Sequence, residues 1–136
     1  MSRVIKFRGY DQENKCWRYG HYYEGVMTDA PLCLNDCRIC RVIIIDGTFY
    51  HVAPESVSQF TGLTDCNGVE IYESDVVADN IGVGIVKYSD QHAGFRVAYG
   101  NGRAKWFYDY MESERKTIEV IGNIYEHPHL LNRSSA

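Results

Sequence analysis

The sequence predicts a mainly β fold, and two observations support this class. The dipeptide Asn67-Gly68 separates two segments in which apolar and polar residues alternate, and it readily takes the positive φ angles of a type I′ hairpin turn. Aromatic residues make up 13% of the 136 residues and include eleven tyrosines, which pack well on the pleated face of a sheet. Short strands joined by tight turns are therefore expected, as in a small barrel or sandwich.

The N-terminal part is expected to begin with a hairpin. Its strands are placed at residues 4–9 and 16–23, with a polar turn at 11–15. Over residues 24–40 the pattern dissolves into an irregular loop rich in glycine, proline, asparagine and aspartate. A loop of this length inside a compact domain is a candidate for variable function or mobility.

A second hairpin is expected at Asp46-Gly47, between strands at 41–45 and 48–52. The first of these strands is a β-branched run, apolar enough to be covered on both faces, so it is the strongest core candidate. Pro54 then favours one helical turn within 54–59, because its fixed φ suits a helix start. We interpret this turn as a connector between two lobes.

The C-terminal part is expected to contain further short strands separated by turns. They are placed at residues 69–72, 76–78, 83–88, 95–99, 106–111 and 117–125. The segment 106–111 is ambiguous. Its alternating aromatic residues favour a strand, although the residues that follow would tolerate a helical turn. Residues 132–136 are expected to form a disordered tail.

The overall charge and hydropathy argue against several classes of protein. A formal net charge of -4 and a pI near 5.7 argue against a dominant phosphate-binding surface. No apolar run approaches the roughly eighteen residues of a membrane span, and the first residues do not have the layout of a signal peptide. We therefore expect a cytosolic protein that makes no membrane contact.

The five cysteines include a cluster of Cys33, Cys37 and Cys40. Three thiolates could bind Zn²⁺ if Cys16, Cys66 or a histidine supplied a fourth ligand. Structural zinc sites present two close pairs of ligands, however, and the second pair is missing. The favoured interpretation is free cysteines that pack as small apolar side chains in a reducing cytosol, and the zinc site is kept as a weak alternative.

Titratable residues form no catalytic pattern that the sequence reveals. The acids Glu70, Glu73 and Asp75 lie close together, but they fall where a strand breaks and are expected to cap turns and face solvent. The five histidines are scattered, and none stands beside a serine or cysteine in a nucleophile setting. We therefore expect no enzyme activity, no catalytic residue and no cofactor.

Aromatic and basic residues alternate in the C-terminal part and suggest a binding surface. The candidates for a protein contact are Tyr99, Arg103, Lys105, Trp106, Tyr108 and Tyr110. The candidates for nucleic acid, with cations on phosphates and an aromatic ring on a base, are Lys87, Arg96, Arg103, Lys105 and Trp106. Because the chain is acidic, a protein partner is favoured over nucleic acid.

Four segments resemble the YopX family in order and spacing. They are residues 6–9 (KFRG), 17–20 (WRYG), 59–77 and 118–126, and the resemblance extends over residues 4–131. This family comprises small proteins encoded by phages and prophages of low-GC Gram-positive bacteria. The chain departs from the family pattern at Ser74, where glycine is usual, and in the cysteine cluster.

The resemblance implies an irregular N-terminal β lobe over residues 1–58 and an SH3-like barrel over 59–131, with no established activity. The favoured hypothesis is a phage or prophage accessory protein in the host cytosol that binds another protein or its own copies. A nucleic-acid-binding barrel and a zinc-binding protein remain the alternatives.

Overall fold

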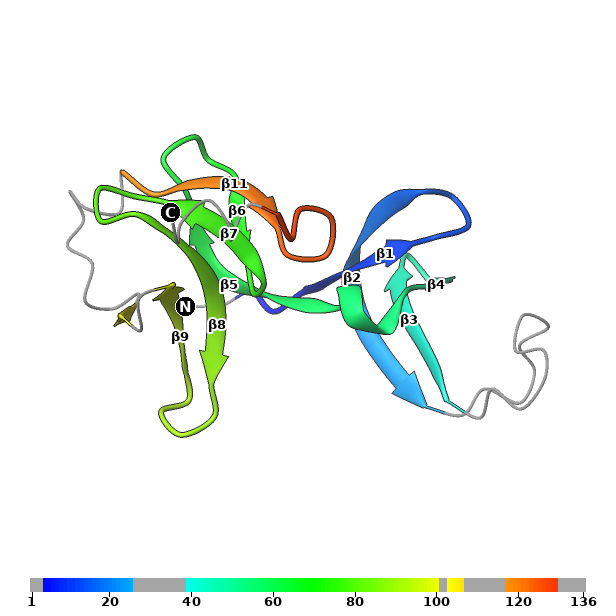
Figure 1. The fold of residues 1–136 in the computed structure, drawn as a ribbon. Helices are drawn as coiled ribbons and strands as arrows, with labels where there is room; N and C mark the ends of the chain where they lie inside the picture. Colours follow the sequence, from blue (N-terminus) through cyan, green and yellow to red (C-terminus); the bar gives the residue numbers. More distant parts are fainter. Residues whose placement is uncertain (1–3, 26–38, 101–102, 107–116, 130–136) are drawn as a thin grey trace. The chain divides into compact units, whose positions relative to one another are not determined.

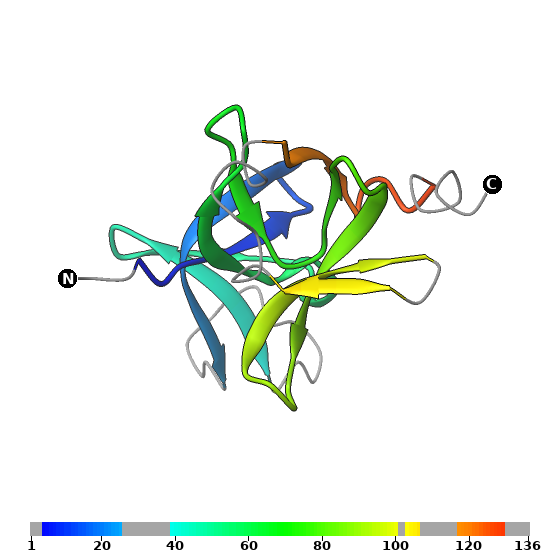
Figure 2. The same cartoon turned by 90° about the vertical axis from the view of Figure 1, so that its left-hand side faces the viewer.

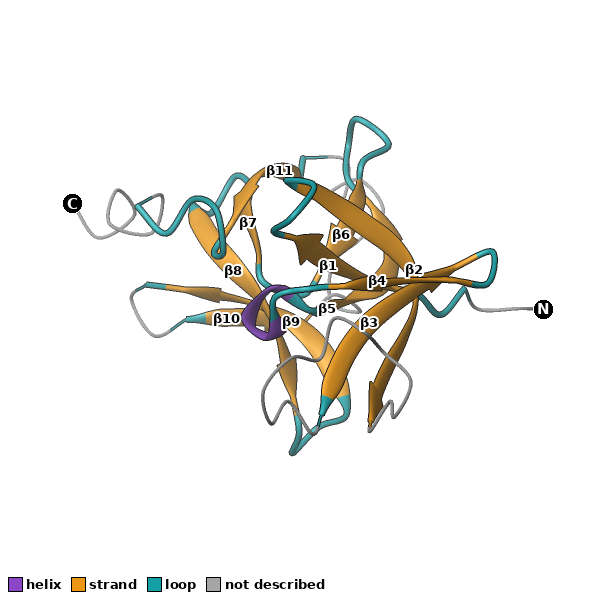
Figure 3. Cartoon of the chain, turned by 90° about the vertical axis from the view of Figure 1, so that its right-hand side faces the viewer, coloured by secondary structure: helices purple, strands orange, loops and turns teal. Residues whose placement is uncertain are grey.

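The computed structural model describes residues 4–25, 39–100, 103–106 and 117–129. In these residues nearly all regular structure is β strand, and the helical content is one short 3-10 turn, η1 (Pro54–Ser56), coloured purple in Figure 3. The mainly β class predicted from the sequence is confirmed. The chain divides into two compact units, Met1–Gln59 and Phe60–Ala136.

The N-terminal unit is built on an antiparallel sheet with strand order β4-β3-β2-β1 (Figure 1). Its strands are β1 (Phe7–Asp11), β2 (Cys16–Gly25), β3 (Cys40–Ile45) and β4 (Thr48–His51). The first two residues of β5 (Ser58–Thr64) pair with β1. The helical turn expected near Pro54 is present as η1.

The hairpin expected at Asp46-Gly47 is confirmed. Asp46 has a φ of 49° and Gly47 a φ of 80°, as a type I′ turn requires at its two central positions. In β3, Val42 and Ile43 point to opposite faces of the sheet, and both are 0% exposed. The apolar run is thus covered on both sides at Val42 and Ile43, as the sequence predicts, whereas Ile44 and Ile45 are half-buried.

The C-terminal unit contains a five-stranded antiparallel sheet with order β10-β9-β8-β7-β11. Its strands are β7 (Asp75–Ala78), β8 (Val83–Ser89), β9 (Gly94–Tyr99), β10 (Ala104–Trp106) and β11 (Glu119–Asn123). The remainder of β5 pairs with β6 (Glu70–Tyr72). Figure 2 shows the β9–β10 pair in yellow. Closure into an SH3-like barrel stays a prediction.

One face of this sheet forms the core of the C-terminal unit. The cluster consists of Ile71, Val77, Val86, Val97, Tyr99 and Ile118. Val86 on β8 lies directly opposite Val97 on β9, and both are fully buried. Because side chains alternate along a strand, their neighbours Lys87 and Arg96 must point to the other face.

The turn at Asn67-Gly68 differs from the predicted type I′ turn. Gly68 has a φ of 80°, but Asn67 does not have a positive φ. The amide of Gly68 donates to the carbonyl of Asp65 (3.1 Å), and the amide of Asp65 donates to the carbonyl of Val69 (2.8 Å). This pattern is a three-residue hairpin loop whose glycine takes the left-handed position. The type I′ prediction is therefore wrong, although the predicted hairpin is present.

The carboxylate of Asp65 explains why the turn takes this form. Its Oδ1 accepts hydrogen bonds from the amides of Asn67 (2.8 Å) and Val69 (2.9 Å), and its Oδ2 accepts one from the amide of Val120 (2.9 Å). The side chain is almost completely buried. One carboxylate therefore satisfies backbone donors of its own turn and also joins that turn to β11.

We predict that Asp65→Ala lowers the free energy of unfolding by about 2–4 kcal/mol, because three backbone N–H groups lose a charged acceptor at a buried position. Asp65→Asn should cost less, since its carbonyl oxygen still accepts. Urea unfolding followed by circular dichroism measures both changes. Asp90→Asn, in an exposed turn, is the control and should shift stability by less than about 0.5 kcal/mol. Equal stability of Asp65→Ala and this control would show that the Asp65 carboxylate does not stabilise the turn.

Asp11 plays a comparable role in the N-terminal unit. Its Oδ1 accepts hydrogen bonds from the amides of Glu13 and Asn14, each at 3.1 Å. Its Oδ2 accepts from Nδ2 of Asn14 (2.8 Å) and from Nε of Arg18 (3.2 Å). Burial raises the pKa of Asp11, but the hydrogen bonds from Asn14 and Arg18 outweigh this effect and hold the pKa below its usual value of 3.8.

This lowered pKa predicts a defined dependence of stability on pH. The stabilisation by the Asp11 carboxylate is fully present above the unfolded pKa, and it is lost as the pH falls through the lower folded pKa. The stability difference between the wild type and Asp11→Asn should therefore be largest near neutral pH and shrink below about pH 4. Urea midpoints measured from neutral to acid pH test this. A difference that stays constant over the whole range would contradict it.

Candidate interaction surfaces

The acids, histidines and cysteines in the described part of the chain do not assemble a metal site. Within residues 4–25, 39–100, 103–106 and 117–129, no group of three or more His, Cys, Asp or Glu side chains could hold a metal ion. A pocket of about 250 Å³ in the N-terminal unit is lined by residues 11–13 and 51–53. Of the two acids in this lining, Asp11 already accepts the four hydrogen bonds described above, so its carboxylate serves the turn, and Glu13 is exposed.

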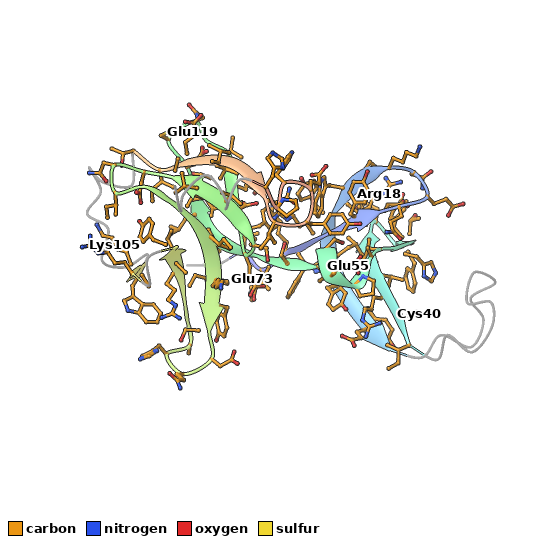
Figure 4. All side chains as sticks on the ribbon, in the orientation of Figure 1. Arg18, Cys40, Glu55, Glu73, Lys105 and Glu119 are labelled. Carbon is orange, nitrogen blue, oxygen red and sulfur yellow. The ribbon has the colours of Figure 1, made fainter. Side chains whose placement is uncertain are left out.

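The cysteines require a correction to the sequence-based expectation. Cys16 and Cys66 are free, as expected. Cys40, at the start of β3 and labelled in Figure 4, is disulfide-bonded. The favoured expectation required a free thiol at Cys40, and the alternative required a thiolate available to Zn²⁺. A disulfide-bonded Cys40 is neither. The other two members of the predicted cluster, Cys33 and Cys37, lie outside the described residues.

Two of the predicted acids, Glu70 and Asp75, act as structural acceptors, but the expectation that these acids face solvent is wrong for Asp75, which is 1% exposed. Oδ2 of Asp75 accepts a hydrogen bond from the amide of Tyr72 at 2.7 Å, which closes the tight connection between β6 and β7. Oε1 of Glu70 accepts a hydrogen bond from the Tyr72 hydroxyl at 3.1 Å.

One surface of the N-terminal unit carries large, half-exposed side chains on three adjacent strands. On β2, Tyr19 and Tyr23 are 46% and 43% exposed, and His21 lies between them on the same face. The register places His21 opposite Ile44 of β3, and Ile44 opposite Phe49 of β4, which is 46% exposed. We call Tyr19, His21, Tyr23, Ile44 and Phe49 the aromatic face.

The opposite side of the same strands is packed differently. Tyr22 contacts Phe7, with ring centroids 5.7 Å apart. Burial raises the pKa of Tyr22, and the hydrogen bond that its hydroxyl donates to Glu24 (3.2 Å) raises it further. The guanidinium of Arg18 lies 3.9 Å from the ring centroid of Tyr50. Aromatic side chains thus occupy both sides of the sheet, but Tyr22 is more buried than its neighbours Tyr19 and Tyr23.

A second surface lies on the C-terminal sheet, on the side opposite the core. Lys87 of β8 pairs with Arg96 of β9, and Arg96 pairs with Trp106 of β10. Three residues from the predicted nucleic-acid set therefore form one row across three strands. His92, in the β8–β9 turn, contacts the Trp106 ring with centroids 4.9 Å apart. We call Lys87, His92, Arg96 and Trp106 the Trp106 cluster.

The other predicted surface residues do not join this row. Lys105, labelled in Figure 4, precedes Trp106 on β10 and pairs with Val97, so it belongs to the opposite side of the sheet. Arg103 is exposed just before β10, and its carbonyl accepts a hydrogen bond from the amide of Tyr99 (2.7 Å). The remaining protein-contact candidates Tyr108 and Tyr110 lie outside the described residues.

The prediction that Tyr99 belongs to a protein-contact surface is wrong, because Tyr99 is a core residue. It is only 8% exposed, belongs to the buried cluster of the C-terminal unit, and donates a hydrogen bond from its hydroxyl to Asp79. Its ring is therefore not part of a contact surface. Alternation on β9 could have indicated this, since Tyr99 shares a face with Val97.

Two features of these surfaces were missed from the sequence. His92 sits in a turn, and only the fold brings it against Trp106. Phe49 joins β2 residues more than twenty positions away through the pairing of β4 with β3 and of β3 with β2. The short spacing in the sequence predicted that β3 pairs with β4. The pairing of β3 with β2 was not predicted, because a long segment separates these two strands.

Comparisons with known proteins agree with the resemblance seen in the sequence. The family model described as YopX protein matches residues 6–132. Among solved structures, the crystal structure of protein EF1440 from Enterococcus faecalis is 27% identical, with 96% of this chain and 99% of that chain covered and a TM-score of 0.44. No curated protein matches the chain. Because the family model spans nearly its whole length, the chain belongs to the YopX family.

Proposed function

We propose that the chain is a non-catalytic interaction module that binds another protein, or a second copy of itself, through the aromatic face of its N-terminal unit. The observation that carries this proposal is that the half-exposed side chains of Tyr19 and Tyr23 on β2 and of Phe49 on β4 lie on one face of the β2-β3-β4 sheet. We further propose that it acts in the host cytosol as an accessory protein of a phage or prophage, which the family resemblance supports.

The chemistry of the aromatic face favours a protein partner. Tyrosine and phenylalanine are enriched in the centre of protein interfaces, where their rings bury much area at a small cost in side-chain entropy. The face carries no Lys, Arg, Asp or Glu among its five members, so covering it with a partner would remove no full charge from water. His21 and the two tyrosine hydroxyls supply the polar groups of this face.

The edge of the sheet adds a second means of contact. In the described residues β4 pairs only with β3, so its other side has no neighbouring strand. An extended segment of a partner could pair with β4 by main-chain hydrogen bonds while its side chains meet Phe49. A partner bound in this way would contact the edge and the aromatic face together.

A double variant tests this proposal. Tyr23→Ser with Phe49→Ser should weaken self-association, or the capture of a specific partner, by at least about 30-fold, because buried aromatic anchors typically contribute 2 kcal/mol or more. Light scattering over a concentration series measures self-association. Quantitative affinity purification from producing cells, comparing wild type and variant, measures partner binding.

The control is Ile81→Ser, which removes a similarly exposed apolar side chain (47%) from a turn of the C-terminal unit. It should leave both measurements unchanged. A wild type that is strictly monomeric and enriches no protein over the double variant would exclude the proposed function. Equal loss in the control and the double variant would place the contact away from the aromatic face.

A further inference from the structure

The Trp106 cluster combines an unusual electrostatic arrangement with a fixed aromatic ring. Lys87 and Arg96 occupy directly opposite positions on neighbouring strands. Like charges directly opposite each other destabilise a sheet. Nothing in the packing of the core requires two cations there, because both residues point away from the buried cluster that contains Val86 and Val97.

No carboxylate compensates this pair in the described chain. Ion pairs such as Arg18 with Asp11 and Arg41 with Glu24 lie in the N-terminal unit and involve neither Lys87 nor Arg96. The nearest acid along the chain, Asp90, is exposed in the β8–β9 turn. Nε of Arg96 is buried and donates no hydrogen bond. The chain as a whole is acidic, yet no acid in the described residues compensates these two cations.

Three residues of the described sheet and its turn lie against the ring of Trp106. It passes over Gly94, where an added Cβ would come within 3.7 Å of the ring. His92 contacts it at an interplanar angle of 63°, and the guanidinium carbon of Arg96 lies 5.6 Å from its centroid. His92 is in turn linked to Ser89 by a 3.1 Å hydrogen bond between Nδ1 and Oγ. The ring is therefore pre-positioned, so a ligand would not bear the cost of ordering it.

We propose that the Trp106 cluster binds single-stranded nucleic acid. In this complex an unpaired base stacks on Trp106, and flanking phosphates bind Lys87 and Arg96. Phosphate would supply the negative charge that the like-charged pair lacks, and the aromatic ring beside it matches the alternation of base and phosphate along a strand. A duplex hides its bases, and an acidic peptide offers charge without a stacking partner, so a single strand fits both features.

Fluorescence anisotropy of a labelled oligothymidylate of about 12 nucleotides tests the site, since single-strand sites on small barrels span about 4–16 nucleotides. Wild-type affinity should fall as salt rises. Lys87→Gln should weaken binding and reduce the slope of log K against log salt by about 0.7, the value for one phosphate contact on a single strand. Trp106→Leu should weaken binding about 5- to 150-fold, the equivalent of one lost stacking contact.

The matched control is Lys15→Asn, which removes one charge from an exposed turn of the N-terminal unit, where its φ of 55° suits asparagine. It should bind like the wild type. Lys87 is exposed, so Lys87→Gln should fold even if Trp106→Leu does not, and thermal unfolding checks both. Absence of binding at low salt, or equal weakening in the control, would overturn the proposal. The proposal would also be overturned if AMP bound as tightly as the oligonucleotide, or if oligoglutamate competed for the site as well as an unlabelled oligonucleotide. None of these results bears on the aromatic face.

Discussion

The close approach of β8 to β9 at Gly84 is the constraint on which the C-terminal unit depends. A Cβ on Gly84 would lie 2.6 Å from Cγ1 of Val97 and 2.8 Å from the carbonyl oxygen of Ala98. A residue with a side chain could not occupy this position without moving rigid neighbours. The glycine thus permits one register, in which Val86 meets Val97 inside and Lys87 meets Arg96 outside. A slip of one residue would exchange these pairs between core and solvent.

Much of this architecture could be predicted because it depends on alternation and turn chemistry. The type I′ turn at Asp46-Gly47 and the doubly covered Val42 and Ile43 were accessible from the sequence alone. The type I′ prediction for Asn67-Gly68 was wrong because it rested on the preference of this dipeptide alone. The carboxylate of Asp65 binds two amides of the turn and stabilises a three-residue loop instead. The hairpin register then depends on a side chain that also binds β11, a contact 55 residues away.

The candidate surfaces were only partly predictable, for a related reason. Lys87, Arg96 and Trp106 could be grouped by type, but their alignment in one row depends on two strand pairings. A net charge of -4 argued against an anion-binding surface because an average over the chain conceals a local pair of cations. The two units consequently present different chemistry, aromatic and uncharged in the first and cationic with a fixed tryptophan in the second.

The register of β8, β9 and β10 is most directly tested by cross-strand nuclear Overhauser effects in solution. The account predicts backbone contacts that pair Lys87 with Arg96 and Arg96 with Trp106, together with contacts between the His92 and Trp106 rings. Contacts displaced by one residue, pairing Lys87 with Val97 or with Phe95, would show that the cations face the core side. Such a result would contradict both the described sheet and the surface built on it.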